Sequence, residues 1–175
     1  GGPENAETTS KFKEAFALAK AAGLPRVPHA GEHDGPAGIR AALEVGDPVR
    51  LGHGVRCSED PHLMEDLQRR GIVLEVCPTS NVLLGVCETL ADHPLPRLLD
   101  AGLTVTINTD DPPMFGVNLN DEYWNCVTTF GWDATQMENL TLNAVQAALI
   151  PDEAKTRLEN EFKAEFARLR PQYGL

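Results

Sequence analysis

Three short groups of polar residues in this sequence have the types and spacing that chemistry requires. The first is His29-Ala30-Gly31-Glu32, which places an imidazole and a carboxylate two small residues apart. A neutral imidazole binds zinc or iron well, and a carboxylate in a dry pocket can hold a proton at neutral pH and act as an acid. The group predicts one metal ligand and one proton carrier. A hydrogen-bonded loop histidine beside a solvated glutamate is the alternative interpretation.

The second group is Gly52-His53-Gly54, in which glycines flank a histidine. Glycine lets the backbone bend sharply and leaves the ring uncrowded, so His53 could come close to a metal-bound water. The alternative is a turn that contains an incidental histidine.

The third group is Asn108-Thr109-Asp110-Asp111, which places two adjacent carboxylates after an apolar run. Two such charges at a buried strand end repel each other and lose solvation, which favours a positive partner beside them. A metal would let one carboxylate act as ligand while its neighbour faces a substrate. A helix cap or an Asx-turn on a solvated loop remains the other interpretation.

The other polar residues give weaker signals. His33, His62 and His93 are interpreted as surface or structural residues. The four cysteines contain no C-x-x-C pair, which indicates reduced thiols, and the zinc-deaminase signature that uses cysteine ligands is absent. Glu75 lies inside an apolar run, so it is either paired across the sheet or strained.

The elements that must position these groups follow one repeated pattern. An amphipathic helix is followed by a short β-rich run four times, and each helix is expected to end near a glycine. The predicted strands are 26–29, 49–53, 72–76 and 103–107. The helices before them start near Thr8 or Thr9, Ala37, Ser58 (as a cap) and Pro94. Three more helices are predicted at 121–129, 134–149 and 152–168, with Asp133 as a cap and Pro151 as a break.

This alternation of helices and strands predicts an α/β fold with a parallel sheet. The candidate residues follow successive strands, as at the active face of a (β/α)8 barrel, although a doubly wound sheet also binds ligands at strand carboxyl ends. A full barrel takes about 250 residues, so 175 residues with four strands correspond to half of one. We expect residues 1–175 to form a single domain.

Charge and hydropathy exclude some classes of partner. The net charge of -11 argues against a surface that binds nucleic acid or an anionic membrane. No apolar stretch approaches a membrane span, and the start lacks a signal-peptide profile, so we expect a cytoplasmic protein. The sequence begins without Met, and we expect it to be a piece of a longer enzyme or one chain of a split one.

Taken together and in order, these groups and the segment Glu75-Val76-Cys77-Pro78-Thr79-Ser80-Asn81 resemble the adenosine deaminase family of the amidohydrolase superfamily. The resemblance runs from Gly1 to about Phe166. It implies a metal-dependent TIM-type (β/α)8 barrel, in which this chain is similar to strands five to eight, the carboxyl-terminal half.

The resemblance implies a role for each matching residue. His29 and Asp110 are similar to zinc ligands of the family. Glu32 resembles the acid that protonates the purine ring at N1, and His53 resembles the residue that takes a proton from the zinc-bound water and orients the hydroxide.

Two further positions are implied to bind the substrate. Asp111 resembles the residue that hydrogen-bonds N7 of the purine. Gly2 resembles the glycine whose backbone amide meets N3, although Pro3 stands where many members have an acidic residue.

The implied reaction is zinc-dependent hydrolytic deamination of a 6-amino purine, with adenosine converted to inosine and ammonia as the expected case. Adenine and aminodeoxyfutalosine are the alternative substrates, and iron is the alternative metal. Other interpretations are an amidohydrolase acting on an amide or lactone, and a non-catalytic purine-binding fragment.

One departure from the family concerns the metal. The family draws two more zinc ligands from a His-x-His motif on its first strand, which this sequence lacks. Since a catalytic zinc has about three protein ligands, we expect a missing amino-terminal half-barrel or, less readily, a second copy of the chain to complete the site.

Overall fold

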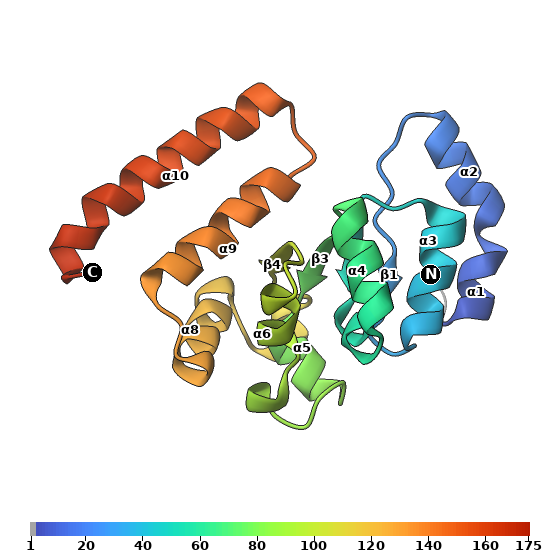
Figure 1. Ribbon diagram of the computed structural model, residues 1–175, viewed down its shortest axis with the longest axis horizontal. Coiled ribbons are helices and arrows are strands. Elements are labelled where there is room, and N and C mark those ends of the chain that lie inside the picture. The colour runs from blue at the N-terminus through green and yellow to red at the C-terminus, as the bar shows by residue number, and fades with distance from the viewer. Residues whose placement is uncertain (1–2) are drawn as a thin grey trace.

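The computed structural model describes residues 3–175, and its centre is a parallel sheet of four strands in the order β1-β2-β3-β4 (Figure 1). Each strand pairs with the next one in the sequence, so that Ala30 lies opposite His53, Gly52 opposite Glu75 and Val76 opposite Ile107. The strands are β1 (His29–Ala30), β2 (Arg50–His53), β3 (Val73–Val76) and β4 (Val105–Ile107).

Helices connect these strands and confirm the predicted α/β class. The connecting helices are α3 (Pro36–Gly46), α4 (Pro61–Arg70) and α6 (Leu95–Asp100). Their apolar faces pack on the sheet, where Ile39, Leu67 and Leu98 are fully buried with the strand residues Leu51 and Leu74. This arrangement of strand and helix units is that of a partial (β/α)8 barrel.

The first strand is shorter than the predicted 26–29 and starts later, so that the two ranges share only residue 29. Pro25 and Pro28 have no backbone N–H, which removes donors from a ladder. The segment still lies along β2, because the carbonyls of Arg26 and Pro28 accept hydrogen bonds from the amides of Val49 and Gly52 at 3.0 and 2.9 Å. Only residues 29–30 form a regular strand.

The helix starts differ from prediction by two residues or more at three places, one of them Leu119 in place of the predicted 121. Asn5, not Thr8 or Thr9, caps the first helical region, α1 (Ala6–Lys11) and α2 (Lys13–Ala21), since its side chain accepts from the amide of Thr8. The predicted cap at Ser58 is wrong: residues Val55–Glu59 form the 3-10 helix η1, and Asp60 caps α4 by accepting from the amide of Leu63.

Three short elements were not predicted, and they are α5 (Pro78–Leu83), η2 (Leu90–Asp92) and α7 (Pro112–Phe115). Each has fewer than two turns, which is too short for a hydrophobic period to appear. Both α5 and α7 begin with proline at the first helical position, where its missing N–H costs nothing.

The last three helices are α8 (Leu119–Phe130), α9 (Ala134–Ala147) and α10 (Asp152–Tyr173). Asp133 caps α9 by accepting from the amide of Gln136, and α10 starts directly after Pro151, as predicted. Figure 1 shows α10 beside α9, at the opposite end of the molecule from α1 and α2.

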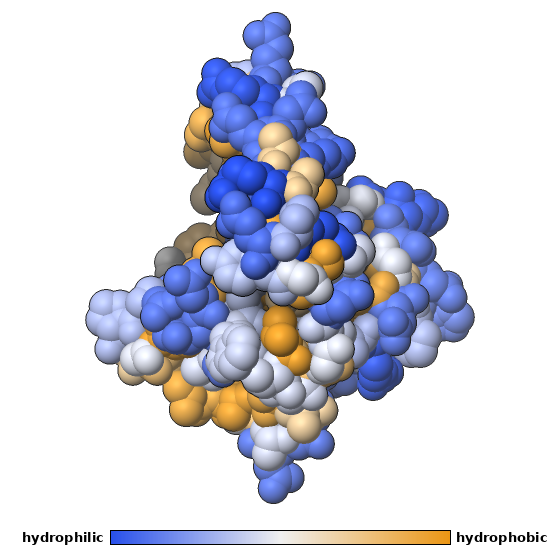
Figure 2. All heavy atoms as spheres, turned by 90° about the vertical axis from the view of Figure 1, so that its left-hand side faces the viewer, coloured by the Kyte–Doolittle hydropathy of each residue, from blue (hydrophilic) through white to orange (hydrophobic). Residues whose placement is uncertain are grey.

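The surface at the α8–α10 end is mostly hydrophilic, with apolar side chains gathered toward its lower part (Figure 2). The helices that lie low in Figure 1 include α5 and α8, whose Leu83 and Leu119 are exposed. Across residues 3–175, no helix combines the length and hydropathy needed to span a bilayer.

Candidate functional site

The candidate site lies where the strands end at their carboxyl side. His29 opens β1, Glu32 follows β1 by two residues, His53 is the last residue of β2, and Asp110 follows β4 by three. His53 and Asp110 have φ angles of 61° and 59°, a region that side chains other than glycine rarely adopt. Such backbone strain costs on the order of 1–3 kcal/mol and is common at functional sites.

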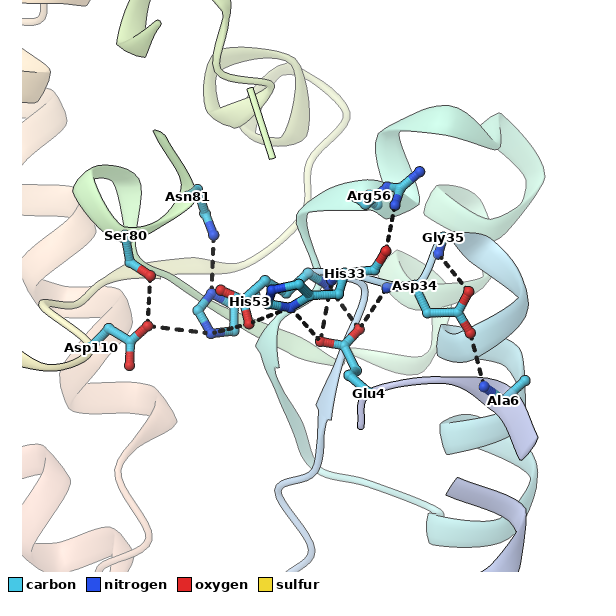
Figure 3. A network of polar contacts seen from close by, with 11 residues as sticks. Glu4, Ala6, His33, Asp34, Gly35, His53, Arg56, Ser80, Asn81 and Asp110 are labelled. Atoms are coloured by element: carbon cyan, nitrogen blue, oxygen red, sulfur yellow. Dashed lines mark hydrogen bonds and ion pairs between the residues drawn. The ribbon is translucent and has the colours of Figure 1, made fainter. Parts of the chain in front are cut away.

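The side chains of these residues converge around the His53 ring, and Figure 3 shows Asp110 directed at that ring. The Nε2 atom of His53 lies 3.5 Å from Oε2 of Glu32 and 3.8 Å from Oδ2 of Asp110. The ring of His29 meets the His53 ring edge to face, with centroids 5.1 Å apart. The structure therefore brings together all four residues predicted to act in catalysis or metal binding.

Gly52 provides space for His29 and not for His53, the ring that the sequence suggested. A Cβ atom at Gly52 would lie 2.3 Å from Cδ2 of His29. A Cβ atom at Gly54 would instead meet the buried side chain of Leu74 at 2.5 Å. The two glycines around His53 thus leave space for the side chains of His29 and Leu74.

Glu32 has the environment of a proton carrier. The side chain is 6% exposed, and its Oε1 atom is buried without a hydrogen-bond partner. Burial raises the pKa of this carboxyl; the nearby carboxylates of Glu4 and Asp110 raise it further, and His33 acts in the opposite direction. A carboxyl of raised pKa holds a proton at a higher pH than an exposed glutamate does.

His53 is held neutral by its surroundings. It is 2% exposed, and burial, followed by the neighbouring His29, lowers its pKa to about 4. Its Nδ1 atom receives a hydrogen bond from the side-chain amide of Asn81 at 3.1 Å.

Helix α5 supplies two site residues whose roles the sequence analysis missed. Ser80 donates from its hydroxyl to Oδ2 of Asp110 at 2.6 Å, and Asn81 contacts His53. Both side chains are fully buried. The sequence signals were the segment 75–81, which carries part of the family resemblance, and Pro78, which marks a helix N-terminus.

Glu4 is another missed residue. Its carboxylate accepts from the backbone amides of Glu32, His33 and Asp34 at 3.0, 3.4 and 3.4 Å, which fixes the turn that carries Glu32 (Figure 3).

The remaining histidines are confirmed as surface or structural residues. His33 and His62 are more than half exposed in their side chains. His93 is 3% exposed, and it hydrogen-bonds Asn81 through Nε2 at 3.1 Å, so it belongs to the interior. Glu75 forms an ion pair across the sheet with Arg50, whose Nε atom lies 3.0 Å from Oε1 of Glu75. Of the two possibilities that the sequence left open for Glu75, pairing and strain, the structure shows pairing.

The predicted substrate-binding residues are less informative. Asp111 is exposed and caps α7, with its Oδ1 atom accepting from the amide of Met114 at 3.1 Å, so the cap interpretation applies to it. A contact with a purine stays a prediction for Asp111. Gly2 lies outside the described residues.

The donor atoms at the site fit a divalent metal. Among the described residues, ligand atoms of His29, Glu32 and His53 lie within 4.8 Å of one another, and so do those of His53, Cys77 and Asp110. Imidazole and carboxylate donors at this spacing suit zinc. Burial raises the pKa of Cys77, which disfavours the thiolate form of this side chain.

Comparison with known proteins identifies relatives of the whole chain. The aminodeoxyfutalosine deaminase of Streptomyces coelicolor is 44% identical over 161 residues, which are 92% of this chain and 42% of that protein. The adenine deaminase of a Chelativorans species is 42% identical over 170 residues, 97% of this chain and 50% of that protein. The chain therefore spans about half the length of these curated relatives.

Solved structures with the same fold include two close matches. The adenine deaminase of Arthrobacter aurescens has a TM-score of 0.86 and 36% identity, with 89% of this chain and 48% of that chain covered. An amidohydrolase of Burkholderia ambifaria, which contains bound zinc, has a TM-score of 0.84 and 27% identity over 92% of this chain and 45% of its own. The family model for adenosine deaminase matches residues 1–165. The chain is a member of the adenosine deaminase family.

Proposed function

We propose that this chain supplies the carboxyl-terminal half of the active site of a metal-dependent purine deaminase. The reaction is hydrolytic: water adds to the ring carbon that bears the amino group, and the bond to that nitrogen breaks. The products are ammonia and a 6-oxo purine. The names of the two curated relatives, both deaminases, and the family match support this reaction class.

The buried carboxyl of Glu32 is the observation that carries the proposal. Attack on a purine is easier when a ring nitrogen is protonated, because the positive charge draws electrons from the neighbouring carbon. Glu32 offers a carboxyl of raised pKa whose Oε1 atom has no partner within the described residues. An amidohydrolase acting on a simple amide would not need a proton donor at this place.

His53 and Asp110 lie on the other side of the same space and would orient the attacking water. His29 and Asp110 would hold the metal, with further ligands from outside this chain. A divalent metal such as zinc, when bound, supplies the Lewis acid that makes water a nucleophile at neutral pH.

The substrate we propose is adenine or aminodeoxyfutalosine, in place of the adenosine expected from the sequence. The two curated relatives carry these names, at 42% and 44% identity. Zinc is the proposed metal, because the related amidohydrolase contains it and the donor set suits it.

The test uses the whole protein that carries this chain, loaded with zinc. Release of ammonia is measured with adenine, aminodeoxyfutalosine and adenosine as substrates. We expect turnover of one of the first two to exceed that of adenosine, and Glu32→Gln to lower kcat by about 10²- to 10⁴-fold, the usual contribution of a general acid.

Metal analysis of the same samples separates the alternatives. Zinc bound in near-stoichiometric amount, with turnover lost only in the Glu32 variant, supports the proposal. A protein that binds purine but holds no zinc and releases no ammonia would be a non-catalytic relative. Preference for an amide or lactone would assign it to another amidohydrolase reaction.

A further inference from the structure

His93 is a buried histidine outside the proposed catalytic set. Its Nδ1 atom receives a hydrogen bond from the backbone amide of Leu95 at 3.0 Å. A backbone N–H can only donate, so Nδ1 of His93 carries no proton. Burial lowers the pKa of His93 to about 4, and a neutral ring must then carry its single proton on Nε2.

This proton decides the orientation of the next side chain. The Nε2 atom of His93 lies 3.1 Å from the side chain of Asn81. Because Nε2 is a donor, the atom of Asn81 that faces it must be the oxygen Oδ1. The opposite orientation would place two N–H donors against each other in a buried site, which leaves both unsatisfied.

The orientation of Asn81 then decides the tautomer of His53. With Oδ1 directed at His93, the Nδ2 amide group of Asn81 points at Nδ1 of His53 over 3.1 Å (Figure 3). Nδ1 of His53 must accept this hydrogen bond, so the ring carries its proton on Nε2. Asn81, His53 and His93 are all at most 3% exposed, so water does not offer an alternative partner.

We propose that Asn81 and His93 are positioning residues that fix His53 as the Nε2–H tautomer. The Nε2–H group faces the carboxylates of Glu32 and Asp110 and the space between them. His53 then donates a hydrogen bond to the reacting water and has no lone pair there with which to bind the metal or to take a proton. The catalytic consequence rests on the proposed function, whereas the tautomer does not.

This assignment changes the role that the family resemblance implied for His53. A residue that takes a proton from water needs a free lone pair on the atom that faces the water. Under this proposal His53 holds and orients the water, and the proton from the water goes to one of the two carboxylates that Nε2 faces, Glu32 or Asp110.

The test is the tautomer itself, measured by ¹⁵N NMR of the histidine rings in the whole, zinc-loaded protein. The His53 resonances are assigned by their loss in His53→Gln. We expect a protonated Nε2 and an unprotonated Nδ1 in the wild type. Asn81→Asp keeps the shape of the side chain but offers Nδ1 only an acceptor, so we expect Nδ1 of His53 to become protonated.

Two further variants make the result specific. His93→Leu frees the amide of Asn81 to turn, so we expect a mixture of His53 tautomers. The matched control is Asn143→Asp, since Asn143 also donates from its side-chain amide, to the carbonyl of Val105 at 3.0 Å, but lies outside the relay. We expect the control to keep the Nε2–H tautomer.

Activity gives the second readout. We expect Asn81→Asp to lower kcat by about 10²- to 10⁴-fold, the range lost when a catalytic histidine has its proton on the wrong nitrogen. The kcat of His93→Leu should lie between those of the wild type and Asn81→Asp, and KM should change little in both variants. The proposal is overturned if His53 stays Nε2–H in Asn81→Asp, or if Asn143→Asp shifts the tautomer equally. A correct tautomer in a protein that deaminates no purine would overturn the proposed function alone.

Discussion

At the scale of single residues, the site depends on a glycine that leaves space for a histidine ring and on two residues with unusual backbone conformations. His29 lies over Gly52, and its ring could not lie there beside a larger residue. His53 and Asp110 reach the same space only because each accepts a backbone conformation with positive φ. The proposed metal ligands and His53 are thus positioned by the backbone of the strand ends.

Gly52→Ala tests the contact between β1 and β2. The new Cβ atom would lie 2.3 Å from Cδ2 and 3.0 Å from Nε2 of His29, so the ring must move. If His29 is a metal ligand, we expect zinc affinity of the whole protein to fall by about 10- to 100-fold, the usual effect of displacing a ligand's support. Competition with a chelator measures it.

The control for this variant is Gly46→Ala, because a Cβ atom at Gly46 would make ordinary contacts of 3.6 Å with Phe16. It should leave zinc affinity unchanged. Equal affinities for wild type and Gly52→Ala would show that His29 does not need its present position to bind the metal.

At the scale of elements, helix α5 contacts the proposed site through side chains that hydrogen-bond Asp110 and His53. It contributes Ser80 and Asn81, and it is tied to α8 through Glu122, a fully buried carboxylate. Both carboxylate oxygens of Glu122 lie 3.2 Å from the amide of Thr79, in the first turn of α5. This contact satisfies an amide that the short helix itself cannot pair.

Glu122→Ala removes that contact. We expect the free energy of unfolding to fall by about 1–3 kcal/mol, because a buried amide loses its partner, and kcat to fall because Ser80 and Asn81 move with α5. Urea denaturation and steady-state kinetics measure the two effects. Glu122→Gln keeps an acceptor oxygen and should lose less of both; identical losses in the two variants would contradict the capping role.

The sequence predicts these elements unequally. Strands β2 to β4 lie within the predicted ranges, since apolar runs of four or five residues ending in polar groups are strong signals. Helix α5 escaped prediction because its six residues are too few to show a period. The relay through Asn81 and His93 could not be predicted either, since it joins residues that only the fold brings together.

At the scale of the whole molecule, the described chain leaves both edges of its sheet unpaired. Within residues 3–175, β1 pairs only with β2, and β4 only with β3. A groove of about 570 Å³ lies beside β1, lined by apolar side chains such as Phe12, Phe16 and Val27. These open surfaces fit a chain that spans about half the length of its relatives.

The stability of the whole protein should depend on pH through His93. Burial lowers the pKa of its folded state from 6.5 to about 4, so the unfolded chain binds more protons between these values. Unfolding free energy then rises with pH across this window, and the stability present above pH 6.5 is lost as pH falls toward 4.

The expected contribution is about 3 kcal/mol, at roughly 1.4 kcal/mol for each pKa unit. Denaturant unfolding of the wild type and of His93→Leu at several pH values measures it. The variant should show a weaker dependence on pH in this window, because the protonation of other buried groups remains. Parallel curves for the two proteins would contradict the assignment.

The order of the strands in the sheet also bears on how the chain reaches this structure. Each of β2, β3 and β4 pairs with its predecessor in the sequence, and the connections between consecutive strands hold α3, then η1 and α4, then α5, η2 and α6. Loop-closure entropy grows slowly with loop length, so these connections cost less entropy to close than pairings between strands farther apart in the sequence would. During synthesis, β2, β3 and β4 each leave the ribosome after the strand with which they pair, so the sheet can form in the order of the sequence.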